Sequence, residues 1–295
     1  MSKKSKNRNI PQLPRQLKRP EKFHSFADCV SLLKTSVYMI VRGREHDNNG
    51  QNGMRWLTLG SGFVAGQYRM LSASHVFDDP NNTDPLAHHQ DTDRYYLLKV
   101  DDLGRWHAAI RQLKLNETLF LYPDRDLAVL YLDEGFYGVD GKMYHEKNDF
   151  IRISKDFHII GTSVGILGYP LSKLEFDDSD INKPRLGNVL LRVDQGVINT
   201  RYRINEHRHQ YEFTMAFNPG NSGGPVFDAK TGRAISIVHG FRVINMRLEE
   251  KDLPKAFQPK QYTEKSYLEP LNASYSVGVA TPSFIDLLGQ HNITH

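Results

Sequence analysis

The chain has 295 residues, of which 39% are hydrophobic and 24% charged, an ordinary globular composition that excludes wholesale disorder. Its longest apolar runs, such as 37–41 and 127–132, fall far short of the roughly 18 residues that a spanning helix needs, which excludes an integral membrane protein. Cys29 is the single cysteine, so neither an intramolecular disulfide nor a cysteine-based zinc site can form.

The net charge of +4 is unevenly distributed along the chain. Residues 1–22 hold eight Lys or Arg and one acid, Glu21, so they carry +7 and the other 273 residues carry −3. We expect residues 1–25 to be a basic disordered tail, with docking to nucleic acid, a membrane surface or a partner as the alternatives. No apolar signal segment follows the tail, and with one cysteine this favours a cytoplasmic location.

Short β-type runs rich in Val, Ile, Tyr and Leu recur along the chain between Gly, Asn, Asp and Pro. A first set of predicted strands covers 36–42, 56–64, 69–72, 95–100, 106–115, 119–122 and 127–132. A second set covers 158–160, 163–167, 188–198, 211–216, 225–227, 234–239 and 276–281. Helical periodicity is confined to 26–34 and 283–288.

Many short strands with few helices predict an all-β protein built as a sandwich or as barrels. The polar segment 134–156 separates the two sets of strands. We therefore expect an N-terminal β-subdomain over 26–140, a linker over 141–156 and a C-terminal β-subdomain over 157–295. Two long polar segments, 78–94 and 241–274, are predicted insertions, either surface elaborations or functional loops.

The strongest chemical signal is the segment NPGNSGGP at 218–225. Three glycines around Ser222 let the backbone turn sharply and let another molecule approach closely. A serine hydroxyl that projects from such a turn suits the nucleophile of acyl transfer. The amide groups of Gly220 and Ser222 are the candidate donors to the oxyanion that this reaction forms.

A serine hydroxyl needs a base, and a base of this kind needs an orienting acid. His75, in the segment SASHV at 72–76, is the candidate base among 13 histidines. Asp126 directly precedes the apolar run LAVL and is the candidate acid, with Asp124 as the local competitor. The chain order of histidine, aspartate and serine is the order found in chymotrypsin.

These motifs, in this order, resemble the chymotrypsin-fold serine proteases, closest to the bacterial HtrA (DegP-like) and glutamyl-endopeptidase branch. The resemblance covers residues about 55–285 and also rests on the following segments: GSGF at 60–63, DLAVL at 126–130, GYP at 168–170, QGVINT at 195–200, AISI at 234–237 and VGVATPS at 277–283. It implies two six-stranded antiparallel β-barrels with a short C-terminal helix and an active site between the barrels. His75 and Asp126 would come from the first barrel and Ser222 from the second. Because the chain ends 12 residues after Ser283, no peptide-binding PDZ domain is expected.

The resemblance also implies which residues contact the substrate side chain before the cleaved bond. They are Ala216, Phe217, Val238, His239, Gly240 and Gly278. Ala216 stands where the trypsin-like subset has an acid, so a preference for Lys or Arg is not expected. The pocket is expected to be apolar, and recognition of an acidic side chain by His239 is the alternative.

The function predicted on this basis is that of a serine endopeptidase acting on a protein or peptide substrate, with no cofactor and no metal. The main alternative is a catalytically silent protease fold that serves as a binding module with a basic docking tail. A regulatory protein is a further expected kind of partner, whereas nucleic acid is expected to bind only through the tail. A metal site at His88 and His89, or at His207 and His209, is a third alternative, but no ligand spacing supports it.

Overall fold

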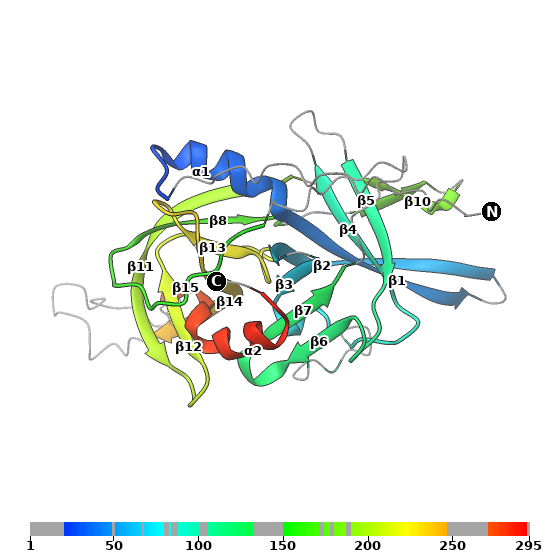
Figure 1. The fold of residues 1–295 in the computed structure, drawn as a ribbon. Coiled ribbons are helices and arrows are strands. Elements are labelled where there is room, and N and C mark those ends of the chain that lie inside the picture. Colours follow the sequence, from blue (N-terminus) through cyan, green and yellow to red (C-terminus); the bar gives the residue numbers. More distant parts are fainter. Residues whose placement is uncertain are drawn as a thin grey trace, which may run out of the picture.

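The computed structural model describes residues 21–48, 51–66, 68–79, 83, 88–100, 106–132, 150–170, 174–177, 180–186, 190–246 and 271–293 (Figure 1). Most of the expected basic tail, most of the expected linker, and the central parts of both insertions lie outside these residues.

The first half of the chain forms one antiparallel sheet whose strands bond in the order β5-β4-β1-β2-β3-β7-β6. The strands are β1 (Val37–Asn48), β2 (Gln51–Gly66), β3 (Arg69–Ser72), β4 (Arg94–Val100), β5 (Trp106–Gln112), β6 (Leu119–Tyr122) and β7 (Leu127–Tyr131). β-branched and aromatic residues dominate the beginning of β1, where Val37 to Val41 are all buried. Because successive side chains of a strand point to opposite faces, both faces of the sheet are covered here.

The second half forms a closed antiparallel barrel of six strands in the order β11-β12-β15-β14-β13-β8. The strands are β8 (Ser163–Gly168), β11 (Arg192–Arg203), β12 (His209–Phe213), β13 (Pro225–Asp228), β14 (Ala234–Met246) and β15 (Leu271–Ala280). Its interior is lined by apolar side chains that include Ile166, Phe213 and Val226. The expected all-β class with two antiparallel units is confirmed.

Some segments differ from the sequence-based expectation. The predicted strand at 158–160 is wrong, because Ile159 and Ile160 are 79% and 64% exposed in a turn that ends at Gly161. An additional hairpin, β9 (Leu174–Asp177) and β10 (Asp180–Leu186), was not expected. The ends of the second insertion continue the β14–β15 ladder as far as Met246 and Leu271.

The first helix and the segment after the last helix each contact one unit while being joined in sequence to the other (Figure 1). Helix α1 (Phe26–Leu33) packs on the second barrel, where the ring of Phe26 stacks on Phe227 with centroids 5.8 Å apart. After helix α2 (Ile285–Gln290), the ring of His291 hydrogen-bonds the hydroxyl groups of Tyr122 and Tyr131 in the first sheet. Each terminal segment therefore ties one unit to the other.

None of the described helices has both the length and the apolarity that crossing a membrane requires.

Candidate active site

The segment 218–224 forms a compact turn immediately before β13. The amide of Asn221 donates to the carbonyl of Asn218 at 3.0 Å, and the amide of Gly224 donates to that of Asn221 at 2.9 Å. Gly220 and Gly223 have φ angles of +97° and +82°, which side chains rarely adopt. These two glycines therefore allow the turn that carries Ser222.

The serine turn is packed against both units. The amide of Ser61 in β2 donates to the carbonyl of Ser222 at 2.8 Å, and its hydroxyl donates to the carbonyl of Gly220 at 2.7 Å. On the other side, the amide of Gly223 donates to the carbonyl of Val238 in β14 at 2.9 Å. A Cβ on Gly223 would lie 2.1 Å from the hydroxyl of Ser72, so the turn can approach the first sheet only with glycine there.

Three amide groups of this turn, those of Asn218, Gly220 and Ser222, find no acceptor in the described part of the chain. The amide groups of Asn221, Gly223 and Gly224 all donate to carbonyl oxygens. Unpaired N–H groups flanking a serine are what stabilisation of an oxyanion requires. The N–H groups of Gly220 and Ser222 are thus available to an acceptor outside the turn.

His75 lies in a short 3₁₀ helix, η2 (Ser74–Val76), which follows β3. Its ring Nδ1 lies 2.9 Å and 3.0 Å from the two carboxylate oxygens of Asp126. The backbone amide of His75 and the hydroxyl of Ser74 each donate to Asp126 Oδ1 at 3.1 Å. The imidazole orientation is therefore fixed by the carboxylate.

Asp126 follows the 3₁₀ helix η4 (Pro123–Arg125) in a left-handed conformation with φ of +49°. This conformation is uncommon outside glycine, though aspartate and asparagine tolerate it best, and it places the carboxylate inward at the start of β7. Asp126 is 4% exposed, whereas the competing Asp124 is exposed. Asp126, and not Asp124, is therefore the acid that contacts His75.

The charges of this pair stabilise each other. Burial would lower the pKa of His75, but the hydrogen bond and the charge of Asp126 outweigh it and raise this pKa above its ordinary value of 6.5. Burial would raise the pKa of Asp126, but hydrogen bonds from His239 and His75 hold it well below its ordinary value of 3.8. Asp126 is therefore ionised at neutral pH and favours the protonated imidazole.

Within the described residues, the hydroxyl of Ser222 makes no hydrogen bond to the His75 ring. The backbone of the serine turn and the residue after His75 both pack against Gly60, where a Cβ would lie 2.6 Å from the carbonyl oxygen of Ser222 and 3.0 Å from the side chain of Val76. Catalytic hydrogen bonds are often long in unliganded proteases and tighten when the substrate binds.

His239, expected in the substrate pocket, also contacts the acid. Its ring Nδ1 lies 2.5 Å from Asp126 Oδ2, and its ring meets that of His75 edge to face with centroids 5.4 Å apart. The sequence indicates a pocket position for His239 but not this contact, because it gives no signal for the register shift in β14 beside this residue.

The other predicted pocket residues occupy different environments. Phe217 and Val238 belong to the buried core of the second barrel, and Gly278 is also buried. Ala216 is exposed and Gly240 is half-buried. A separate groove of about 480 Å³ lies beside His239 and is lined by Tyr202, Ile204, Gln210, His239, Phe241 and Val277.

His75, Asp126 and His239 are also the one group of possible metal ligands in the described part of the chain, with ligand atoms within 4.8 Å of one another. Both Nδ1 atoms and the carboxylate are engaged with each other, so a metal could bind there only by replacing these hydrogen bonds. At the histidine pair considered from the sequence, His88 Nδ1 bonds Asp78 and His89 Nδ1 bonds Tyr95.

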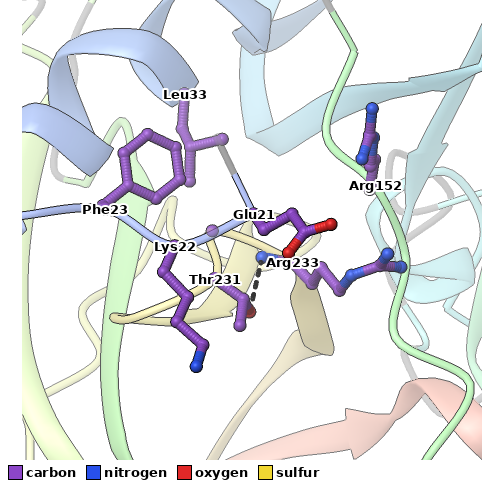
Figure 2. A pocket seen from close by; sticks show the side chains of 8 residues that line it. Glu21, Lys22, Phe23, Leu33, Arg152, Thr231 and Arg233 are labelled. Carbon is purple, nitrogen blue, oxygen red and sulfur yellow. Dashed lines mark hydrogen bonds between the residues drawn. The ribbon is translucent and has the colours of Figure 1, made fainter. Parts of the chain in front are cut away.

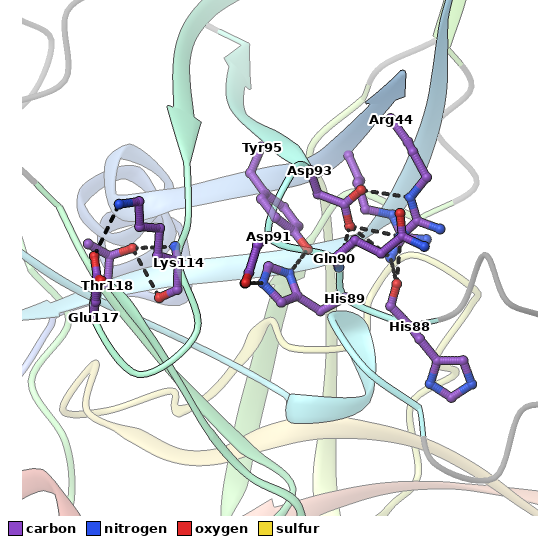
Figure 3. A network of polar contacts seen from close by, with 11 residues as sticks. Arg44, His88, His89, Gln90, Asp91, Asp93, Tyr95, Lys114, Glu117 and Thr118 are labelled. Carbon is purple, nitrogen blue, oxygen red and sulfur yellow. Dashed lines mark hydrogen bonds and ion pairs between the residues drawn. The ribbon is translucent and has the colours of Figure 1, made fainter. Parts of the chain in front are cut away.

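The first insertion is held by a buried polar network (Figure 3). Arg44 makes two hydrogen bonds to Asp93, at 2.7 and 2.8 Å, and the carbonyl of His88 accepts from both Arg42 and Arg44. Asp93 is fully buried. The side chain of His88 in turn bonds Asp78, three residues after His75, in a partly exposed contact that connects the network to the segment after the candidate base.

A second cavity, of about 310 Å³, lies where the N-terminal segment meets the β13–β14 turn (Figure 2). Its lining includes Lys22, Arg152 and Arg233 together with Glu21 and Thr231. It shares no residue with the cluster around His75, and nothing else in the described structure marks it as a site.

Comparison with known proteins gives the family. The sequence profile described as "Trypsin-like peptidase domain" matches residues 60–237. The solved structure of the HtrA-type protease AlgW with a decapeptide is similar with a TM-score of 0.52 and 20% identity, covering 91% of this chain and 67% of that chain. A variant of AlgW with a decapeptide is similar with a TM-score of 0.51 and 18% identity, covering 92% and 68%. No curated protein sequence matches this chain.

At these identities the likeness to AlgW shows the fold, which is chymotrypsin-like as expected. The family profile spans more than half of the chain, including His75, Asp126 and Ser222. The chain therefore belongs to the trypsin-like peptidase family.

Proposed function

We propose that the protein is a serine endopeptidase in which Ser222 is the nucleophile, His75 the general base and Asp126 the residue that orients the base. The observation that carries this proposal is the hydrogen bond between the buried carboxylate of Asp126 and His75 Nδ1, at 2.9 Å, beside the serine turn. This bond keeps the other ring nitrogen, Nε2, unprotonated in the neutral imidazole, as a base requires.

The reaction follows from these roles. Ser222 Oγ attacks the peptide carbonyl carbon and gives its proton to His75 Nε2, while the N–H groups of Gly220 and Ser222 bind the negative oxygen. The proton then passes to the leaving amine as the C–N bond breaks, which leaves an acyl-enzyme. A water molecule, deprotonated by His75, releases the acid and restores the serine hydroxyl.

A peptide is the proposed substrate class. The two similar structures of AlgW were both determined with a decapeptide, which supports a polypeptide as the ligand of this fold. Ala216 brings no charge to the position where trypsin-like enzymes have an acid, so the proposed preference is apolar and excludes Lys and Arg. Action in the cytoplasm, suggested by the single cysteine, also remains a proposal.

A hydrolysis assay distinguishes the proposed peptidase from the alternative, a catalytically silent binding module. Wild-type protein should hydrolyse peptides from a diverse library and generate new protein termini in a proteome digest, and Ser222→Ala should abolish both. Ser163→Ala is the control, because Ser163 is an exposed serine on β8 and its loss should leave activity unchanged. Equal hydrolysis by wild type and Ser222→Ala would overturn the proposed function, as would no hydrolysis by wild type.

A further inference from the structure

Asp126 is contacted by a second imidazole besides that of the proposed base. His239 Nδ1 lies 2.5 Å from Oδ2, whereas His75 Nδ1 lies 2.9 Å from Oδ1. The two rings stand nearly perpendicular, at 88°. His75 Nδ1 also lies 3.0 Å from Oδ2, so both rings contact this oxygen, and the carboxylate cannot rotate without disturbing its contact with at least one ring.

The local structure of β14 directs His239 toward this carboxylate. Val238 points into the core of the barrel and is fully buried, so its neighbour His239 points out of the barrel. The pairing register with β15 then shifts between Val238 and Gly240. Gly240, the next residue, has a φ of +155°, and no atom lies within 4 Å of where its Cβ would be. The space beside the residue that follows His239 is therefore not filled by other described atoms.

The ring of His239 also forms part of a groove. The groove has a volume of about 480 Å³. Four of its six lining residues have aromatic or aliphatic side chains, namely Tyr202, Ile204, Phe241 and Val277. Phe241 is 57% exposed and Ile204 is 51% exposed. Contact of apolar side chains with water is unfavourable in free energy, so an apolar group that covers them would be stabilised here. The lining therefore matches one large apolar side chain of a bound peptide.

We propose that His239 is a positioning residue that links this groove to the active site, holding Asp126 through Nδ1 while its ring forms a wall for an apolar substrate side chain. The inference rests on the proposed peptidase function. The His239 side chain is 34% exposed, so water competes for its bond to Asp126. A bound apolar side chain excludes that water and strengthens the bond, because hydrogen bonds to a charge are stronger at low dielectric.

Two substitutions separate the two roles of His239. His239→Asn keeps an N–H donor near the position of Nδ1 but removes most of the ring that forms the groove wall. His239→Phe keeps a ring of similar size but removes the donor. Neither substitution introduces a charge.

With a peptide that carries a large apolar residue for the groove, His239→Phe should lower kcat about tenfold or more and change KM by less than about threefold. His239→Asn should raise KM about tenfold and change kcat by less than about threefold. With a matched peptide that has glycine in that place, the KM effect of His239→Asn should disappear. Equal effects of both variants on kcat, or no effect of either, would overturn the inference.

A measurement that does not depend on turnover guards against misfolded variants. The imidazole N–H protons bonded to Asp126 should give downfield NMR resonances, one from each ring. His239→Phe should lose one resonance and keep that of His75, which also reports an intact fold. A wild-type spectrum with the His75 resonance alone overturns the inference but not the proposed function. Absence of hydrolysis by wild type overturns both.

Discussion

At the scale of single residues, the account depends on Asp126. Its carboxylate is nearly fully buried, yet it accepts hydrogen bonds from two imidazole rings, one hydroxyl and one backbone amide. A buried carboxylate is unstable without such donors, because burial disfavours its charge. The donors therefore keep Asp126 charged, and that charge raises the pKa of His75.

This arrangement predicts the pH dependence of hydrolysis. His75 acts as a base only when neutral, and its pKa lies above 6.5, so kcat/KM should rise with pH through an acid limb above 6.5. Asp126→Asn removes the charge that raises the pKa, so its acid limb should move to lower pH. It should also lower kcat by about 10⁴-fold, because an amide no longer selects the correct tautomer. An acid limb that does not move in Asp126→Asn would contradict this account.

The sequence was sufficient to find the residues of the acid–base pair but not all of their contacts. His75 and Asp126 stand in short motifs whose order carries the information, and the structure brings the two together. The role of His239 depends on which way a side chain points beside a register shift in β14. No local pattern records that shift, so the sequence placed His239 in the substrate pocket alone.

At the scale of elements, the end of the first insertion is held by buried charge. Arg44 and Asp93 form a bidentate ion pair between β1 and the end of the first insertion, and both are buried. Removing either partner of such a pair destabilises the fold, because the charge of the other partner then stays buried without compensation. The insertion is therefore part of the fold of the first unit at this end.

This pair gives a prediction for stability. Asp93→Ala should lower the free energy of unfolding by about 3–5 kcal/mol, since it leaves Arg42 and Arg44 without their carboxylate. The control is Glu45→Ala, which removes an exposed ion pair with Arg94 and should change stability by less than about 0.5 kcal/mol. Both values can be measured by urea denaturation. A loss below about 1 kcal/mol for Asp93→Ala would contradict the assignment.

Strands were predicted well where a short apolar run is fully buried, as in β7 and β13. The prediction failed at 158–160 because exposed isoleucines imitate that pattern without entering a ladder. It also missed β9 and β10, a two-stranded hairpin whose register shifts between Asp180 and Pro184. Charged and proline-containing segments of this kind have no strand signature in the sequence.

At the scale of the whole molecule, the proposed active site is assembled from distant parts of the chain. η2 and the start of β7 supply His75 and Asp126 from the first unit, whereas the turn before β13 supplies Ser222 from the second. The bond from the Ser61 amide to the Ser222 carbonyl joins the two units at the site itself. The crossing of α1 and His291 between the units supports this alignment from both ends of the chain.

The most direct test of the central claim is covalent labelling with a fluorophosphonate, which reacts with an activated serine. We expect one adduct per chain by intact mass spectrometry, located on Ser222 by peptide mapping, and no adduct in Ser222→Ala or His75→Ala. A wild-type protein that stays unlabelled, or an adduct on Ser222 that forms equally fast without His75, would contradict the claim that His75 and Asp126 activate this hydroxyl.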